Sequence, residues 1–215
     1  MIKGIIFDLD GVLTFTDKYH FLAWKSIADK ENIYFDEKIN NRLRGVSRMD
    51  SLNIILERAT KEYTQEEKEE LAFLKNEKYK EYLNEFTPQE VSDDVRFTLD
   101  ALKKKGYKLA VGSASKNTMM IMEKTDLLKY FDAIADGTKI THSKPDPEVF
   151  LLAAKLINLP VDECYVVEDA YAGIDAAFNG KFKSIGIGDA SKYERANFHI
   201  TKLSDILDIL KDEPK

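Results

Sequence analysis

The sequence predicts an α/β protein in which a mostly parallel sheet has helices on both faces and an all-helical insertion near the N-terminus. Three observations lead to this prediction. Short apolar runs alternate with amphipathic, helix-like segments along most of the chain. Most of the apolar runs lead into glycine or an acidic residue, as buried strands of a parallel sheet commonly do. Residues 16–87 interrupt the alternation, because only helical patterns occur there.

The first strand is expected in residues 2–9, an apolar run rich in isoleucine and phenylalanine that leads into Asp10 and Gly11. A run that is apolar on both faces is typical of a strand buried inside a parallel sheet. Further strands are expected at residues 108–111, 131–135, 165–167 and 184–187.

Amphipathic helices are expected between these strands. Val95, Leu99 and Leu102 have the i, i+4, i+7 spacing of one helix face. Pro145 is expected to be the first residue of a helix that runs through residues 150–157, because proline is favoured at that position. Near the C-terminus, a further apolar stripe consists of Leu203, Ile206, Leu207 and Leu210.

Residues 16–87 are expected to form a helical domain inserted into the sheet domain, which then consists of residues 1–15 and 88–215. One of its helices is marked by an apolar stripe at Leu52, Ile55, Leu56 and Ala59. The charged segment 64–83 predicts a longer helix. The two crossings between the domains would form a natural hinge.

The composition is that of a folded, soluble protein. Hydrophobic residues make up 44% and charged residues 33%, which excludes disorder as the main state. The net charge of −6 argues against a nucleic-acid partner. No apolar stretch approaches the roughly 20 residues of a membrane span and no signal peptide is evident, so we expect a cytoplasmic protein with no membrane partner. The single cysteine, Cys164, is expected to be a buried free thiol.

Polar residues with matching chemistry follow several of the expected strands. Ligands of parallel sheets bind outside the carboxyl ends of the strands. The residues expected there are Asp8, Asp10, Ser113, Lys144, Glu168 and Asp169. Carboxylate oxygens suit Mg²⁺, and a hydroxyl with an ammonium group suits a phosphoryl group. A carboxylate beside a divalent cation is a competent nucleophile toward phosphorus, so the set predicts phosphoryl transfer through an aspartyl-phosphate.

Each of these residues alone has a simpler interpretation. An aspartate at a strand end is usually a turn former. Ser113 can cap the next helix, and Lys144 can be a solvated loop residue. Their joint occurrence in this order, each beside a strand end or in the loop that follows, favours the functional interpretation.

Four segments resemble the sequence motifs of the haloacid dehalogenase superfamily. They are residues 8–14 (DLDGVLT), the loop at Ser113, residues 144–147 (KPDP) and residues 168–174 (EDAYAGI). The resemblance runs through the whole chain and implies a Rossmann-like core domain with an inserted helical cap. Within the superfamily, residues 19–25, 45–48, 50–52 and 113–117 look most like the β-phosphoglucomutase family.

The resemblance implies a role for each matching acidic residue. Asp8 would be the nucleophile that carries the phosphoryl group. Asp10 would be the general acid and base, and its main-chain carbonyl would be a metal ligand. Glu168 and Asp169 would complete an Mg²⁺ site with Asp8.

Two phosphate sites are also implied. The transferring phosphoryl group would be held by Ser113, the Ala114 amide and Lys144. The second, non-reacting phosphate would be held by Arg48 of the cap together with Ser115, Lys116 and Asn117 of the core.

Other cap residues would act on the sugar or on Asp10. His20 and Lys75 would couple cap closure to the positioning of Asp10, and Gly45 and Val46 would let the cap backbone approach the sugar. Thr16 and Trp24 also belong to the implied substrate site, although packing inside the cap is the better explanation of Trp24. Without the resemblance, His20 would be interpreted as an ordinary surface histidine.

The implied reaction interconverts β-D-glucose 1-phosphate and D-glucose 6-phosphate through β-glucose 1,6-bisphosphate, with Mg²⁺ as cofactor and a monomer as the expected state. A sugar-phosphate phosphatase would share Asp8 and Asp10 but let water attack the phosphoenzyme, and Arg48 favours the mutase. A non-catalytic phosphate- or metal-binding module would be expected to lack Asp8 or Asp10. Two positions depart from the family pattern: Phe15 replaces a polar residue, and Arg44 replaces a lysine.

Overall fold

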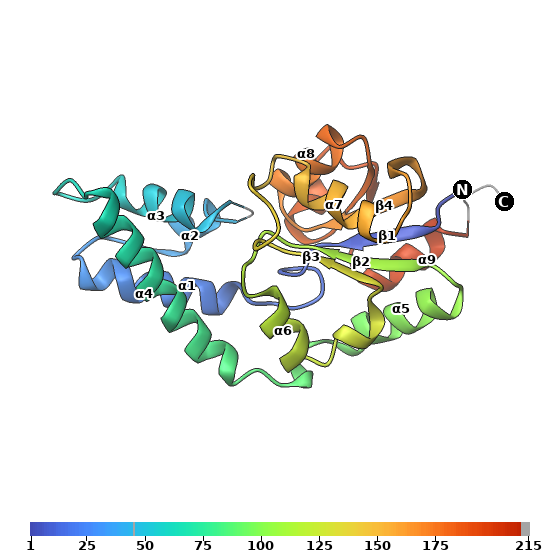
Figure 1. Ribbon diagram of the computed structural model, residues 1–215, viewed down its shortest axis with the longest axis horizontal. Helices are drawn as coiled ribbons and strands as arrows, with labels where there is room; N and C mark the ends of the chain where they lie inside the picture. Colours follow the sequence, from blue (N-terminus) through green and yellow to red (C-terminus); the bar gives the residue numbers. More distant parts are fainter. Residues whose placement is uncertain (45, 212–215) are drawn as a thin grey trace.

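The computed structural model describes residues 1–44 and 46–211 (Figure 1). Within these residues, a parallel six-stranded sheet has the strand order β3-β2-β1-β4-β5-β6. The strands are β1 (Gly4–Phe7), β2 (Lys108–Gly112), β3 (Ala133–Ala135), β4 (Cys164–Glu168), β5 (Lys183–Gly186) and β6 (Phe198–His199). The predicted parallel sheet is therefore confirmed, with β1 near its centre.

Helices cover both faces of the sheet, as predicted (Figure 1). On one face, Ile5 and Phe7 share a core with α5 (Asp93–Lys104), α6 (Thr118–Lys124) and α9 (Ile206–Ile209). On the other face, Ile6 packs with α7 (Glu148–Leu156) and α8 (Tyr171–Asn179). Successive residues of β1 thus enter opposite cores, which explains why the strand is apolar throughout. Short 3₁₀ helices lie at Pro88–Glu90, Leu128–Tyr130, Val161–Glu163, Gly188–Lys192 and Leu203–Asp205.

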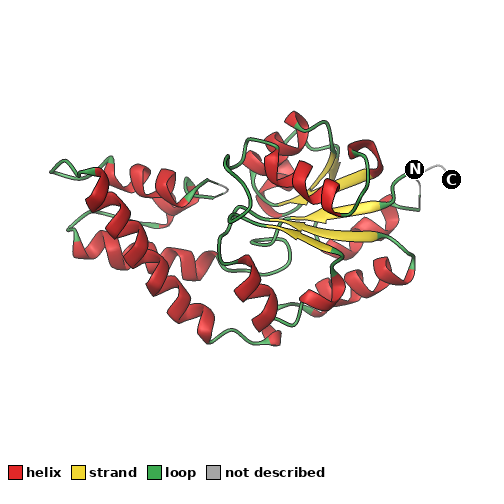
Figure 2. Ribbon diagram, viewed as in Figure 1, coloured by secondary structure: helices red, strands yellow, loops and turns green. Residues whose placement is uncertain are grey.

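From residue 16 to the short turn at Pro88–Glu90, the described residues form helices joined by loops, with no strand among them (Figure 2). The helices are α1 (Asp17–Lys30), α2 (Glu37–Asn41), α3 (Arg48–Leu56) and α4 (Gln65–Asn84), and we call this group the helical insertion. Its own apolar core includes the buried Trp24, Leu52 and Leu71. The long helix α4 starts with a capping box, in which the Thr64 hydroxyl accepts from the Glu67 N–H and the Glu67 carboxylate accepts from the Thr64 N–H.

Some element boundaries differ from those expected. The prediction that a helix begins at Pro145 is wrong, because α7 begins at Glu148. The Asp146 carboxylate accepts the Glu148 N–H at 2.9 Å, and Pro147, with φ of −77°, is the residue that leads into the helix. β1 is shorter than residues 2–9, because its pairing with β2 and β4 runs only from Gly4 to Phe7. β6 was not expected, because two residues carry no periodic signal.

Cys164 is the first residue of β4 and is buried, as predicted. None of the helices in the described ranges is both long enough and apolar enough to cross a membrane.

Candidate active site

A cavity of about 650 Å³ lies between the carboxyl ends of the strands and the helical insertion. Every site residue predicted from the sequence lines it, except Gly45, which lies outside the described residues. The core contributes Asp8, Asp10, Ser113, Ala114, Ser115, Lys116, Asn117, Lys144, Glu168 and Asp169. The helical insertion and the segment that leads into it contribute Thr16, His20, Trp24, Val46, Arg48 and Lys75.

A tight turn follows β1 and brings Asp8 and Asp10 to the cavity. The Asp8 N–H extends the sheet by donating to the Val167 carbonyl of β4 at 2.9 Å. Gly11 has φ of +79°, and a Cβ there would lie 2.0 Å from Oδ2 of Asp169. Only glycine therefore fits, and its lack of a side chain lets the Asp169 carboxylate approach the turn.

Lys144 joins two buried carboxylates at the centre of the site. Its Nζ donates to Asp8 Oδ1 at 2.7 Å and to Glu168 Oε1 at 2.5 Å, and all three side chains are at most one-tenth exposed. Burial alone would lower the pKa of Lys144, but the charges of Asp8 and Glu168 outweigh it and raise that pKa. The cation therefore stays protonated where it faces both the proposed nucleophile and any phosphoryl group bound beside it.

Asp8, Glu168 and Asp169 form a compact group of oxygen donors. One ligand atom from each lies within 4.8 Å of the others. Burial raises the pKa of Glu168 and of Asp169, and the negative charge of Asp8 adds to both shifts. These three carboxylates are costly to ionise together, so a bound divalent cation would stabilise the arrangement.

Asp10 lies beside this group but has a different environment. Burial, followed by the charge of Asp8, raises the pKa of Asp10 to about 6. The Thr16 hydroxyl donates to Asp10 Oδ1 and opposes the shift. A carboxyl group with this pKa can both give and take a proton near neutral pH.

The buried Lys75 pairs with the half-buried His20 on the insertion side of the cavity. Lys75 Nζ lies 2.8 Å from His20 Nδ1, and Lys75 is only 3% exposed. The same Nζ lies 4.9 Å from the Trp24 ring centroid and 4.6 Å from that of Tyr79, whose ring stacks on His20. Trp24 is 2% exposed in the insertion core, so its contacts are those of a packing residue that also shields Lys75.

The pKa of Lys75 predicts a pH-dependent stability. Burial, followed by the charge of Arg48, lowers the pKa of Lys75 from 10.5 to about 7. Between these values the unfolded chain binds more protons at this residue than the folded chain does, so its contribution to the free energy of unfolding rises with pH. Urea denaturation at a series of pH values should show wild type gaining stability relative to Lys75→Met from pH 7 toward pH 10. Lys78 of the same helix, whose side chain is 40% exposed and pairs with Glu81, supplies the control Lys78→Met. An equal pH dependence of both variants would contradict the buried charge.

The loop after β2 presents successive polar groups to the cavity. Ser113 is anchored by its N–H, which donates to the Ala135 carbonyl at 3.0 Å. Its hydroxyl accepts the Ser115 N–H at 3.1 Å, and the Ser115 hydroxyl accepts the Asn117 N–H at 3.2 Å. Hydrogen bonds within the loop therefore fix its conformation before α6 begins. Lys116 of this loop is exposed.

The helical insertion contributes two arginines to the cavity lining. Arg48 is the first residue of α3, and burial lowers its pKa while the charge of Glu77 opposes that shift. Arg44 connects the insertion to the core, because it donates to Asp17 at the start of α1 and to Asp189 beyond β5, both at 2.7 Å. Arg44 departs from the family pattern and Asp189 belongs to no motif, so neither role could be predicted: an ion pair between distant segments leaves no local pattern in the sequence.

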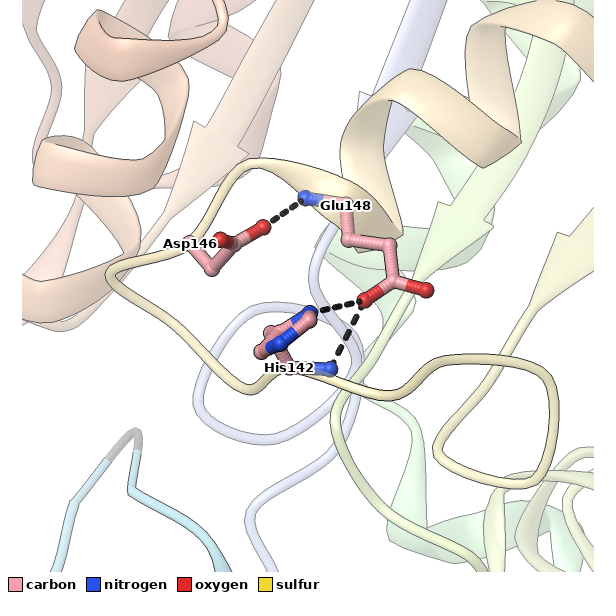
Figure 3. A group of neighbouring side chains, drawn as sticks. All are labelled: His142, Asp146 and Glu148. Atoms are coloured by element: carbon pink, nitrogen blue, oxygen red, sulfur yellow. Dashed lines mark hydrogen bonds and ion pairs between the residues drawn. The ribbon is translucent and has the colours of Figure 1, made fainter.

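His142, Asp146 and Glu148 form a second group of possible metal ligands (Figure 3). The Glu148 carboxylate accepts the backbone N–H groups of Thr141 at 3.0 Å and His142 at 2.7 Å, and it contacts His142 Nδ1 at 3.2 Å. The Asp146 carboxylate accepts the Glu148 N–H. By accepting these backbone N–H groups, the two carboxylates stabilise the turn that carries Lys144. We therefore interpret the group as structural.

Comparisons with known proteins extend over both parts of the chain. A model of the haloacid dehalogenase-like hydrolase family matches residues 2–180. A β-phosphoglucomutase of Bacillus subtilis is 38% identical over 215 residues, which are 99% of this chain and 95% of that protein. The crystal structure of a β-phosphoglucomutase from Clostridium difficile matches with a TM-score of 0.92 and 36% identity, covering 99% of this chain and 96% of that one. A phosphorylated carbohydrates phosphatase of Thermotoga maritima is 28% identical over 221 residues, covering 98% of this chain and 99% of that protein.

Proposed function

Because the chain belongs to the haloacid dehalogenase-like hydrolase family, we propose that it is a phosphomutase that interconverts β-D-glucose 1-phosphate and D-glucose 6-phosphate. One observation carries the proposal beyond the family: a single cavity is lined by two separate sets of groups suited to phosphate. Lys144 pairs with Asp8 and Ser113 lines the same cavity, which Arg48 and residues 115–117 line as well. A mutase that works through a bisphosphate needs both sets, and arginine suits the fixed phosphate because its planar fork binds two oxygens.

Asp8 would attack phosphorus with a carboxylate oxygen. The new bond joins that oxygen to phosphorus, and the bond between phosphorus and the sugar oxygen breaks. Lys144, already held at 2.7 Å from Asp8, would balance the negative charge of the transferring group. In the other half-reaction, the 6-hydroxyl of β-D-glucose 1-phosphate takes the phosphoryl group from phosphorylated Asp8 and forms the bisphosphate. The bisphosphate turns round, Asp8 attacks the phosphorus at C1, and D-glucose 6-phosphate leaves.

Asp10 would supply and remove the protons of these two steps. Its neutral form gives a proton to the leaving sugar oxygen, and its ionised form takes one from the attacking hydroxyl. A pKa of about 6 leaves both forms accessible near neutral pH. Thr16, which donates to Asp10, would hold the carboxyl group in place.

We propose residues 16–87 as a cap that closes over the bound sugar. The cavity between the insertion and the sheet gives this role its physical basis. Closure would exclude water, because a phosphoenzyme open to solvent would be lost by hydrolysis. His20 and Lys75, which pair inside the insertion, would link closure to Asp10, while Val46, which lines the cavity, would face the sugar.

Mg²⁺ is the cofactor we propose. Asp8, Glu168 and Asp169 would hold it with the main-chain carbonyl of Asp10, since hard oxygen donors are the ligands this ion prefers. When bound, the ion would neutralise charge on the phosphoryl oxygens.

Adding Mg²⁺ should raise the unfolding temperature, because a cation that binds only the folded chain stabilises it. The gain is about 2.7 kcal/mol at a free concentration of 100 times the Kd. Thermal unfolding in EDTA and in saturating MgCl₂ measures the shift, and EDTA should also abolish activity. Asp169→Asn should remove the shift, whereas Asp146→Asn, in the group of Figure 3, should retain it. The opposite pattern would move the metal site to that second group.

The proposed reaction is tested directly. The protein is incubated with Mg²⁺, β-glucose 1-phosphate and a trace of β-glucose 1,6-bisphosphate, and glucose 6-phosphate and free phosphate are followed together. Isomerisation with little phosphate release is expected. Stoichiometric phosphate release without isomerisation would overturn the mutase in favour of a sugar-phosphate phosphatase, the candidate favoured by the Thermotoga maritima relative.

A further inference from the structure

A buried hydrogen bond joins the helical insertion to the core next to the cavity. Asn117 Nδ2, at the start of α6, donates to Asn76 Oδ1 of α4 at 2.9 Å. Asn76 is 9% exposed and Asn117 is 8% exposed, so water competes little for either group. The two helices pack against each other (Figure 1). Asn117 lines the cavity, but Asn76 is not among the residues that line it.

The orientation of a carboxamide group needs an external partner to fix it. Turning the group by 180° exchanges oxygen and nitrogen at little steric cost, and an oxygen presented to an anion repels it. The Asn76 oxygen can only accept, so it selects the orientation in which the Asn117 nitrogen faces α4. This contact uses one of the two hydrogens of that nitrogen, and the second hydrogen is left for an anion.

We propose that Asn76 is a positioning residue for the non-reacting phosphate of the substrate, acting through the carboxamide of Asn117. The inference rests on the proposed function, because it assumes that Asn117 contacts a second phosphate. Through Asn76, the helical insertion would help to form the phosphate site without itself contacting the phosphate there. Without Asn76, the Asn117 group is free to turn, and its buried nitrogen loses an acceptor.

The test compares a substrate that has an anchor phosphate with one that does not. Asn76→Ala should raise the KM for β-glucose 1-phosphate by about three- to tenfold, as expected for a weakened hydrogen bond to an anion. The hydrolysis of acetyl phosphate, which has only the reacting phosphate, should change by less than about twofold. In the Asn117→Ala background, adding Asn76→Ala should cause no further rise in KM, because the effect passes through Asn117.

Asn84→Ala is the matched control, since Asn84 is an exposed asparagine at the end of the same helix. If Asn76→Ala does not fold, Asn76→Ser carries the same comparison with a side chain too short to reach Asn117. Equal losses on both substrates, or KM effects that add in the double variant, would overturn the positioning role while the mutase proposal stands. A wild-type protein that does not isomerise the sugar phosphate would overturn both.

Discussion

Asp8→Asn should abolish isomerisation, with a loss of at least about 10⁴-fold in kcat. The amide oxygen is a poor nucleophile toward phosphorus, and the change also removes one oxygen donor from the group of three carboxylates. Lys144 would keep Glu168 as its partner, so the fold should survive. Glucose 6-phosphate formation measures activity, and an acid-stable, hydroxylamine-sensitive phosphoenzyme measures the intermediate. Both should be undetectable.

The control for Asp8→Asn is Asp136→Asn. Asp136 is 2% exposed and directly follows β3, so it matches Asp8 in burial and in its place at a strand end. Its carboxylate accepts the Thr138 N–H, and it does not line the cavity among the described residues. Asp136→Asn should therefore retain activity. Isomerisation by Asp8→Asn within about tenfold of wild type would rule out Asp8 as the nucleophile.

Asp10→Asn should impair proton transfer to and from the sugar oxygen while leaving the nucleophilic attack by Asp8 possible. Loss of general acid and base catalysis should slow isomerisation by about 10²–10⁴-fold. Acetyl phosphate should still phosphorylate Asp8 in this variant, because acetate leaves without needing a proton. Rapid-quench measurements of phosphoenzyme from the two donors give the comparison. Equal losses with both donors would show that Asp10 does not act as the acid.

The pKa of about 6 at Asp10 also fixes the sign of the pH dependence. Transfer from a sugar phosphate to Asp8 needs neutral Asp10, so in single turnovers this step should slow as the pH rises above about 6. Attack of a sugar hydroxyl on the phosphoenzyme needs ionised Asp10, so that step should slow as the pH falls below about 6. Asp10→Asn should remove both limbs.

The core half of the site could be predicted because it follows from local signals. Asp8 and Glu168 stand at the ends of apolar runs, and the rules of parallel sheets bring such ends together. The start of α7 could not be predicted in this way, because two prolines lie two positions apart there and only hydrogen bonds of the turn decide that Pro147 leads into the helix.

The site residues of the helical insertion could be predicted only from the family resemblance, because helix periodicity does not say which face of a helix meets the sheet domain. Nothing in the spacing of α4 distinguishes Asn76 from the other polar residues of a highly charged helix. Its partner Asn117 is 41 positions away, and the bond exists only because α4 packs against α6. Contacts of this kind are set by tertiary packing, so only the three-dimensional arrangement reveals them.

The link from Arg44 to Asp189 makes the mouth of the cavity sensitive to dissolved ions. Asp189 is 65% exposed at its side chain and Arg44 is 34% exposed, so the pair is worth only about 0.2–1 kcal/mol. At physiological ionic strength the screening length is about 8 Å, and more salt weakens such a pair further. Raising the ionic strength should therefore favour wider separation of the two domains, which makes the salt content of the medium a means of tuning how easily sugar phosphates enter and leave.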